Sequence, residues 1–301
     1  MGWKINDLPR QDERNALVTG GASGIGFQVA QALGKKGAHV TIVGRDAAKG
    51  AQAVAQLRAA GGDYAFEQMD LASQASIAEF ASRWGERPLH LLMNVAGVMA
   101  VPERSLTADG YEMHMGTNFL GHFALTGRLL PVLKAASARV VTVSALVGRF
   151  KMAELDPDDL QAERQAYTPM AAYARSKLAD IMFAAELQAR ASAANSGVTS
   201  VSVDPGTANT SLQRYTSGAA AVVGKGLINL IGYPLERVAE NVLFAAAMEQ
   251  PTEQMLIVPS FFIQRLASPH DAGLPPLARQ QAMRVRLWEK AESLTGVRFH
   301  I

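Results

Sequence analysis

The sequence contains no cysteine in 301 residues. This absence excludes disulfide bonds, thiolate metal sites and a cysteine nucleophile, and it fits a reducing compartment. The six histidines are scattered, without the paired spacing of a zinc-binding helix, so we expect no metal site. The G-x-S-x-G motif of the α/β hydrolases is also absent from the chain.

Long apolar runs and an excess of one charge are missing as well. No stretch reaches the roughly 18 uninterrupted apolar residues that a membrane-spanning helix needs. The formal net charge is only +2, and the basic residues form no run that would follow a phosphate backbone. The first residues, MGWKINDLPRQDERN, lack the apolar core of a signal peptide. We therefore expect a cytoplasmic protein with no membrane span and no nucleic acid as partner.

The chain does contain a regular alternation of short apolar runs and longer helical patterns. Seven runs rich in β-branched residues predict strands, at 16–20, 38–44, 64–70, 88–97, 138–145, 197–206 and 253–259. Helical patterns occupy 24–36, 46–60, 73–84, 107–135, 171–195 and 234–249. This order predicts a single α/β domain over 1–301, a doubly wound Rossmann fold with a parallel seven-stranded sheet and helices on both faces. Residues 1–14 would form a polar leader and 260–301 a C-terminal extension.

Two long connections interrupt this alternation, at 146–170 and 207–233. Both follow the carboxyl end of a predicted strand, where open α/β sheets bind ligands, and long connections of this kind often form lids or binding loops. The second connection is apolar and includes Leu212, Tyr215 and the run LINLI. It fits a hydrophobic substrate, and it fits equally a second hydrophobic helix packed on the sheet.

A strand, a glycine-rich turn and a helix follow one another in LVTGGASGIGFQVAQAL. Glycine lets such a turn tighten and brings backbone N–H groups close to a pyrophosphate at the helix N-terminus, although a turn without any ligand is the alternative. The second predicted strand ends in IVGRD. Arg45 suits a 2′-phosphate, unless it is simply a solvated surface residue, and Asp46 stands where the next helix needs an N-cap. We therefore predict NADP(H) in preference to NAD(H).

Tyr173 and Lys177 stand four positions apart in AAYARSKLAD and so share one face of the predicted helix. An ammonium group beside a phenol favours the phenolate, which lowers the phenol pKa from near 10 toward neutrality. Such a pair can give a proton to a carbonyl oxygen, or take one from an alcohol, while a hydride moves to or from a nicotinamide. On spacing alone, an ordinary exposed pair on a helix surface is the commoner explanation.

The motifs resemble those of the short-chain dehydrogenase/reductase family, in the same order, over roughly residues 15–210. TGGASGIG matches the cofactor turn, MDLAS the adenine-contacting Asp70 with Leu71, and NVAG the family's N-N-A-G with Val95 in place of the second Asn. DPGTANT matches the segment at the nicotinamide end. The long segment after the fifth strand, the wording NFLGHFALT and the later RLWEKAESLTG are similar to the retinol-dehydrogenase-like branch.

The resemblance also implies a role for each residue of a catalytic tetrad. Ser144 would polarise the substrate carbonyl, and Tyr173 would act as general acid and base. Lys177 would lower the pKa of Tyr173 and hold the nicotinamide ribose, and Asn118 would position a water between the lysine and solvent. The cofactor would be bound by Gly20, Ser23, Gly24, Ile25, Gly26, Arg45, Asp70, Leu71, Asn94, Ala96, Gly97, Tyr173, Lys177, Pro205, Gly206, Thr207 and Thr210.

These features together predict an NADP(H)-dependent carbonyl reductase or alcohol dehydrogenase that acts on a hydrophobic small molecule. Members of the family often pair through long helices, which is compatible with a homodimer or a homotetramer here. A non-catalytic NADP(H)-binding sensor is the alternative from another class, but such proteins often lose the tyrosine or the lysine. A sugar-nucleotide epimerase shares Y-x-x-x-K, yet it needs a larger C-terminal substrate domain than this chain leaves room for.

Overall fold

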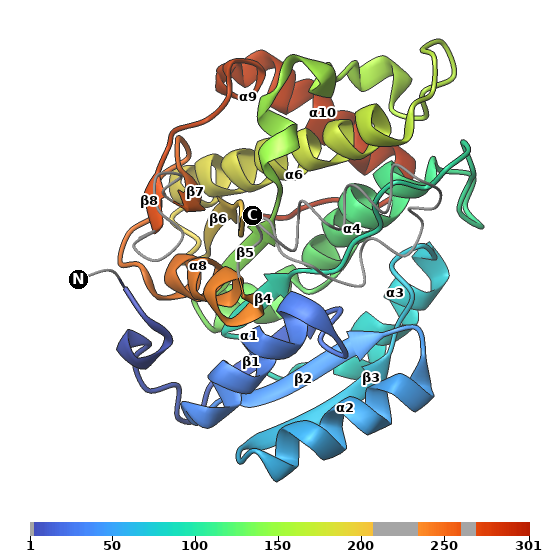
Figure 1. The fold of residues 1–301 in the computed structure, drawn as a ribbon. Helices are drawn as coiled ribbons and strands as arrows, with labels where there is room; N and C mark the ends of the chain where they lie inside the picture. The colour runs from blue at the N-terminus through green and yellow to red at the C-terminus, as the bar shows by residue number, and fades with distance from the viewer. Residues whose placement is uncertain (1–2, 207–233, 260–268) are drawn as a thin grey trace.

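The computed structural model describes residues 3–206, 234–259 and 269–301. In these residues one sheet of eight strands forms the centre of the fold. Helices cover the sheet, as Figure 1 shows. The strand order across the sheet is β3-β2-β1-β4-β5-β6-β7-β8. The bounds are β1 (Asn15–Thr19), β2 (His39–Gly44), β3 (Asp63–Gln68), β4 (Leu91–Asn94), β5 (Arg139–Val143), β6 (Thr199–Val203), β7 (Leu256–Pro259) and β8 (Pro269–Asp271).

The predicted doubly wound α/β fold is confirmed, with one strand more than the predicted seven. Strands β1 to β7 pair in parallel, and the additional β8 pairs antiparallel with β7 at the edge of the sheet. The sequence of β8 is Pro-His-Asp, and proline and aspartate are depleted in strands, so no strand pattern marks it. Strand β4 is shorter than predicted because the chain leaves the sheet after Asn94.

Helices cover the sheet at the predicted positions, with one exception at 107–135. Residues 107–112 of that range are not helical: Leu106 and Glu112 form an isolated bridge around a turn in which Gly110 has φ +82°. A new helix begins at Leu130, with Pro131 in its first turn, so the rest of the range divides into a π-helix and two α-helices. The α-helices are α1 (Gly24–Lys35), α2 (Ala47–Ala59), α3 (Gln74–Trp84), α4 (Gly121–Arg128), α5 (Leu130–Ala135), α6 (Pro169–Ala193), α8 (Leu235–Ala247), α9 (Pro276–Arg279) and α10 (Gln281–Thr295).

Four short 3₁₀ turns and one π-helix complete the described structure. None of the described helices is long and apolar enough to cross a membrane. The predicted connection 146–170 is not an open loop, because two of its turns pack against α6. The turns are η1 (Ile5–Asp7), η2 (Met115–Leu120, the π-helix), η3 (Leu146–Arg149), η4 (Lys151–Ala153) and η5 (Pro157–Asp159).

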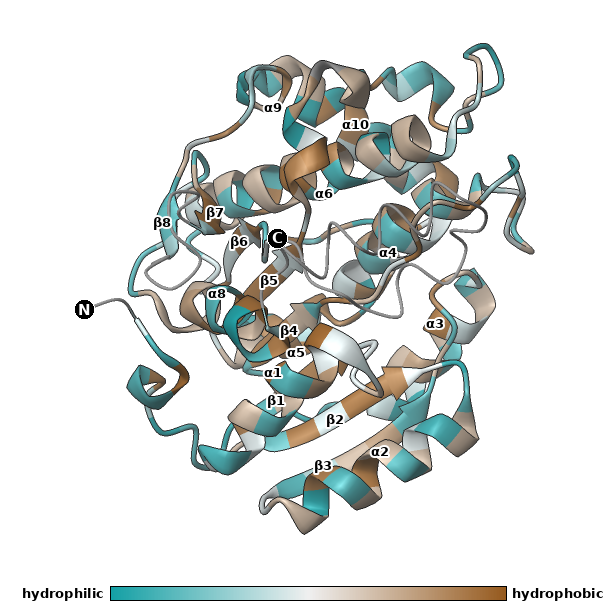
Figure 2. Cartoon of the chain, viewed as in Figure 1, coloured by the Kyte–Doolittle hydropathy of each residue, from teal (hydrophilic) through white to brown (hydrophobic). Residues whose placement is uncertain are grey.

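Strand residues alternate between two hydrophobic cores, one on each face of the sheet. Leu17 and Leu92 belong to the larger core, with residues of α3, α4, α6 and α10. Their neighbours Val18 and Met93 belong to the smaller core, with residues of α1, α2 and α8. Because both faces are covered, the strands read as nearly continuous apolar runs, visible as brown segments along β2 and β5 in Figure 2.

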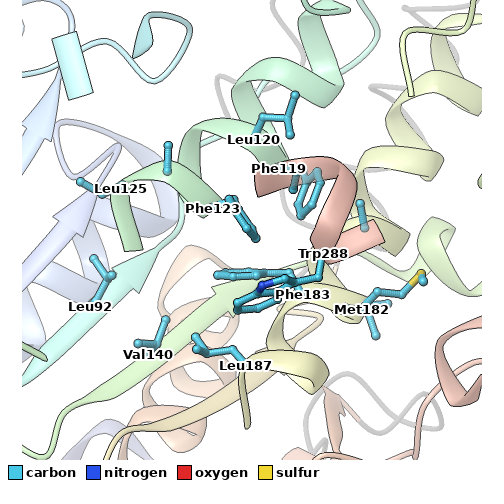
Figure 3. Packing of buried hydrophobic residues seen from close by; sticks show 14 of the residues in the cluster. Leu92, Phe119, Leu120, Phe123, Leu125, Val140, Met182, Phe183, Leu187 and Trp288 are labelled. Carbon is cyan, nitrogen blue, oxygen red and sulfur yellow. The ribbon is translucent and has the colours of Figure 1, made fainter. Parts of the chain in front are cut away.

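An aromatic cluster joins the C-terminal extension to the larger core. Trp288 of α10 lies 5.1 Å from Phe123 of α4 and 5.9 Å from Phe183 of α6, measured between ring centroids. Phe299 adds a fourth ring, 4.5 Å from Trp288. Figure 3 shows Phe119, Phe123, Phe183 and Trp288 packed together between these helices, with the rings of Phe183 and Trp288 stacked. The described part of the predicted extension, residues 269–301, therefore contributes side chains to the larger core.

We expect Phe183→Ala to lower the free energy of unfolding by about 3–5 kcal/mol, because it removes a buried ring from this cluster and leaves a cavity. Phe183 is 2% exposed, whereas Phe150 is 51% exposed and makes the matched control. Phe150→Ala should change the unfolding free energy by no more than about 0.5 kcal/mol. Chemical denaturation of both variants measures the difference, and equal effects would contradict the assigned core.

Candidate functional site

A cavity of about 480 Å³ opens at the carboxyl edge of the sheet, where the strand order reverses between β1 and β4. Open α/β sheets bind ligands at this switch point. Segments that follow six of the strands, β1 to β6, line the cavity together with α6. The predicted cofactor residues on its wall are Gly20, Ser23, Gly24, Ile25, Gly26, Arg45, Asp70, Leu71, Ala96, Gly97, Tyr173, Lys177, Pro205 and Gly206.

One predicted cofactor residue points elsewhere, and two lie outside the described residues. Asn94 is 1% exposed and is not part of the cavity wall, because its side chain turns into the protein and donates a hydrogen bond to Thr126. The residues after it form the wall instead, and a cofactor contact of Asn94 stays a prediction. Thr207 and Thr210, like the apolar connection 207–233, lie outside the described residues.

The glycine-rich turn has the backbone that a dinucleotide site needs. Gly20 adopts φ +67°, a left-handed conformation that favours glycine, and it follows β1 directly. A Cβ atom at Gly26 would lie 2.6 Å from the carbonyl oxygen of Gly20, so only glycine permits this close approach. Helix α1 begins at Gly24 and directs its first backbone N–H groups into the cavity mouth, as an anion site requires.

Arg45 and Asp46 follow β2 and have separate roles. The Asp46 carboxylate accepts a hydrogen bond of 3.0 Å from the backbone N–H of Lys49, which confirms it as the N-cap of α2 and holds its pKa below the ordinary value. Arg45 is exposed and lines the main cavity. It also lines an adjoining cavity of about 430 Å³, whose other lining residues are Glu67, Gln68, Asp70, Ser76, Glu79 and Arg83. Arg45 therefore lies where the two cavities adjoin.

Helix α6 places Tyr173 and Lys177 on the cavity wall. The helix begins at Pro169, and the N-cap Thr168 accepts a hydrogen bond from the N–H of Ala171. Every residue from 172 to 188 is buried, because α6 packs against β5, β6, η2, η3, η4 and α10. A helix surrounded on all sides has no polar face, which explains its alanine-rich sequence. The alternative of an ordinary exposed pair is therefore excluded.

Lys177 is held by two acceptors in this structure. Its Nζ donates to the carbonyl oxygen of Val143, at the end of β5, and to Oδ2 of Asp180, both at 2.8 Å. The side chains of Lys177 and Asp180 are 4% and 1% exposed. Burial raises the pKa of Asp180 to about 6, although the ammonium of Lys177 opposes this rise. One of the three N–H donors of Lys177 is left for a ligand in the cavity.

Tyr173 does not show the lowered pKa that its spacing from Lys177 predicts. Burial raises the pKa of Tyr173, and the carboxylates of Asp180 and Asp204 raise it further. The Nζ of Lys177 lies 5.9 Å from the centroid of the Tyr173 ring, and its charge is already compensated by Asp180. Tyr173 is therefore a protonated phenol, in a state to donate a proton.

Ser144 lies at the cavity, but its hydroxyl is directed to α6. Its Oγ donates a hydrogen bond of 2.7 Å to the backbone carbonyl of Lys177, and the residue is 2% exposed. A hydroxyl has a single proton, so Ser144 in this conformation has none to give to a substrate carbonyl. The role implied by the resemblance is thus not supported by the geometry. The next residue on the cavity wall, Ala145, carries no polar group.

Asn118 lies in the π-helix η2 and organises the chain after β4. Its side-chain amide exchanges hydrogen bonds with the backbone of Val98, at 2.8 and 3.0 Å, and donates to Ser176. The backbone carbonyl of Asn118 accepts from Nδ1 of His122 at 2.7 Å. The π-helix widens one turn at this position, as π-bulges at functional sites often do. The side chain of Asn118 therefore positions the cavity wall and is not itself part of it.

His122 connects this π-helix to the end of β1, a link that the sequence prediction missed. Its Nε2 lies 2.9 Å from the hydroxyl oxygen of Thr19, which in turn accepts hydrogen bonds from the N–H groups of Val95 and Ala96. Burial lowers the pKa of His122 to about 3, and the charge of Lys177 adds to this effect. A neutral ring can donate from Nδ1 and accept at Nε2, so His122 holds the backbone at Asn118 and the side chain of Thr19 together. The sequence signal that could have predicted this link is the position of His122 four residues after Asn118, which places both on one face of a helix.

A second buried pair, Glu112 and His114, lies behind Tyr173. His114 Nδ1 is 2.8 Å from Glu112 Oε1, and the rings of His114 and Tyr173 are 6.1 Å apart. Burial alone would raise the pKa of Glu112, but hydrogen bonds from His114 and Met115 outweigh it and lower the pKa. No group of three or more potential metal ligands occurs among the described residues.

We expect the unfolding free energy to fall with decreasing pH because His122 takes up a proton only when the chain unfolds. Burial lowers the pKa of His122 from 6.5 to about 3, so the unfolding free energy falls as the pH is lowered from 6.5 toward 3. The slope of this fall is at most about 1.4 kcal/mol per pH unit, the value for one proton. His122→Gln should flatten the pH dependence of denaturant unfolding. His300→Gln, at an exposed histidine, is the control and should leave the slope unchanged. Parallel slopes in all three proteins would refute a neutral His122.

The sequence is similar to those of known dehydrogenases, which fits a cavity shaped for a dinucleotide. A family model described as short chain dehydrogenase matches residues 14–157. The polyprenol dehydrogenase of Homo sapiens is 37% identical over 299 residues, which cover 96% of this chain and 87% of that protein. Retinol dehydrogenase 11 of Mus musculus is 44% identical over 210 residues, which cover 67% of this chain and 64% of that protein.

A solved structure supports the same assignment. The Pseudomonas aeruginosa RhlG/NADP active-site complex superimposes with a TM-score of 0.64 at 27% identity, covering 83% of this chain and 95% of that one. The likeness to polyprenol dehydrogenase extends over nearly the whole chain and well beyond the segment that the family model matches. The chain therefore belongs to the short-chain dehydrogenase/reductase family of oxidoreductases, in its retinol-dehydrogenase-like branch.

Proposed function

We propose that this protein is an NADP(H)-dependent oxidoreductase that interconverts a carbonyl and an alcohol on a hydrophobic small molecule. The observation that carries the proposal is the position of Tyr173 and Lys177 on the wall of the same cavity as the glycine-rich turn. Sequence spacing alone does not bring a proton donor to a dinucleotide site. The relatives named above are dehydrogenases, which favours an enzyme over a non-catalytic sensor.

The residues of the cavity fit a nicotinamide dinucleotide along its length. The approach permitted by Gly26 and the start of α1 suit the pyrophosphate, and Lys177 retains one N–H donor for the nicotinamide ribose. The bound cofactor supplies the hydride that reaches the carbonyl carbon. Tyr173 gives its phenolic proton to the carbonyl oxygen in reduction, and its phenolate takes the hydroxyl proton of the alcohol in oxidation.

An apolar substrate is supported by the wall around Tyr173. Met99, Leu146, Val147 and Met170 line the cavity together with the catalytic side chains, and Met170 remains 40% exposed. Two relatives are named after polyprenol and retinol, which are both hydrophobic alcohols. We extend the proposal to a cytoplasmic enzyme, and to a homodimer or homotetramer as its assembled form.

We expect Tyr173→Phe to lower kcat by at least about a hundredfold and to leave NADPH binding nearly intact, because it removes the hydroxyl that supplies the proton and keeps the ring on the cavity wall. The assay is NADPH consumption across a panel of lipophilic aldehydes and ketones. Tyr111→Phe is the matched control, since the Tyr111 hydroxyl donates to the carbonyl of Leu294 and does not line the cavity. Ser144→Ala should keep turnover within about tenfold, because its proton is already committed to Lys177.

Two results in this assay would overturn parts of the proposal. Near-normal turnover in Tyr173→Phe would remove the proton-transfer mechanism. A loss in Ser144→Ala as large as that in Tyr173→Phe would return Ser144 to the role of carbonyl donor.

The preference for NADP(H) is tested at Arg45. A planar guanidinium suits a 2′-phosphate, and the nearby carboxylate of Asp46 is occupied as a helix cap. The superimposed RhlG structure is an NADP complex, which supports the same preference. We expect Arg45→Asp to weaken NADPH binding by at least about tenfold and to leave NADH binding nearly unchanged. Fluorescence titration with both cofactors measures this, and equal affinities before and after the substitution would refute the assignment.

A further inference from the structure

The carboxylate of Asp180 is a buried charge that the proposed mechanism has not used. It lies one helical turn after Lys177 on α6, and the two side chains form an ion pair of 2.8 Å. Oδ2 accepts from Lys177, whereas Oδ1 is buried and has no hydrogen-bond partner among the described residues. Buried polar atoms are nearly always paired, so this one calls for an explanation.

Stability does not provide that explanation. Burial of two charges costs solvation energy that their attraction recovers only when the remaining polar atoms are satisfied, and Oδ1 is not. The pair also joins residues three positions apart on one helix, so it ties no distant elements together. A well-packed apolar side chain would serve the fold as well or better. The role of the carboxylate is therefore to be sought in its electrostatic effect on Lys177 and on the nearby Tyr173.

The charges that face Tyr173 come from several elements. Lys177 and Asp180 are on α6 itself, and Asp204 follows β6. The ring of His114 lies beside Tyr173 and is paired with Glu112. His122 of α4 lies near Lys177 and is neutral at physiological pH. In this set, Lys177 is a cation 5.9 Å from the centroid of the Tyr173 ring, and its ion pair with Asp180, at 2.8 Å, compensates its charge.

We propose that Asp180 is a positioning residue that sets the pH range of the proton transfer, by holding Lys177 in a neutral pair so that Tyr173 stays protonated at neutral pH. This inference rests on the proposed function for its catalytic consequence. Removal of the carboxylate leaves an uncompensated ammonium group close to the phenol. An uncompensated cation favours the phenolate, so both the oxidation and the reduction profiles move to lower pH.

The first test is the pH dependence of kcat/KM for alcohol oxidation with NADP⁺, compared between the wild type and Asp180→Asn. Oxidation needs the phenolate, so its rate rises with pH, and we expect that rise to occur at least about one pH unit lower in the variant. Glu186→Gln is the matched control. It also removes a buried carboxylate from α6, but one that pairs with Arg190 and Arg284 away from the cavity. It should lower stability without moving the profile.

A second test does not depend on turnover. The ionisation of Tyr173 is followed by tyrosinate absorbance, as the difference between each protein and the same protein carrying Tyr173→Phe. Asp180→Asn should ionise at lower pH than the wild type. Lys177→Met should ionise at higher pH than the double variant Lys177→Met/Asp180→Asn, since the single variant keeps the carboxylate and the double variant keeps neither charge. This second comparison remains informative if Asp180→Asn does not fold.

The outcomes separate this inference from the function on which it rests. Shifted tyrosinate titrations in a protein that turns over no substrate would support the role of Asp180 and contradict the proposed activity. Turnover with coincident pH profiles and coincident titrations in wild type and Asp180→Asn would overturn the role of Asp180 and leave the activity standing. A profile that moves equally in Glu186→Gln would also overturn it, because the effect would then be structural.

Discussion

The burial of α6 between the sheet and the C-terminal helix α10 is the constraint on which the candidate site depends. Helix α6 packs against β5 and β6 on one side and against α10 on another, so it has little freedom to slide or rotate. The phenol of Tyr173, the ammonium of Lys177 and the carboxylate of Asp180 all belong to this helix. Their mutual distances are thus set by helical geometry, and their position over the cavity is set by packing.

The other side of the cavity is held by a chain of hydrogen bonds rather than by one rigid helix. Thr19, at the end of β1, receives the backbone N–H groups that follow β4, and it meets the ring of His122. His122 in turn donates to the carbonyl of Asn118. This series of hydrogen bonds joins the cofactor turn, the point where the strand order reverses, and the π-helix through buried groups. The cofactor side and the proton side of the cavity are therefore parts of one connected framework.

Local patterns in the sequence were enough to predict the architecture and much of the cavity wall. β-branched runs located the parallel strands, and the glycine-rich turn and Asp46 matched their predicted conformations because each depends on a few adjacent residues. Strand β8 was not predicted, because its three residues have a low strand propensity and form a strand only by pairing with β7 at the edge of the sheet. The directions of the Asn94 and Ser144 side chains could not be predicted, because a motif names a residue without its rotamer, and both polar groups turn into the protein.

The electrostatics of the site could not be predicted from spacing alone. Lys177 was expected to act on Tyr173, but burial and two carboxylates reverse the direction of the pKa change. Asp180 was visible in the sequence three positions after Lys177, yet nothing in the pattern says that both would be buried together. A pKa depends on every charge within a few ångströms and on solvent access, which are properties of the folded chain.

The aromatic cluster around Trp288 has a consequence for how the chain folds during synthesis. The rings of Phe123 and Phe299 pack 4.8 Å apart although they lie far from each other in the sequence. The larger core therefore cannot close until Phe299 has left the ribosome. Until then Phe123 of α4 and Phe183 of α6 lack the rings of Trp288 and Phe299 that cover them in the folded protein. The nascent chain thus carries a hydrophobic surface that a chaperone can bind until α10 and Phe299 have been synthesised.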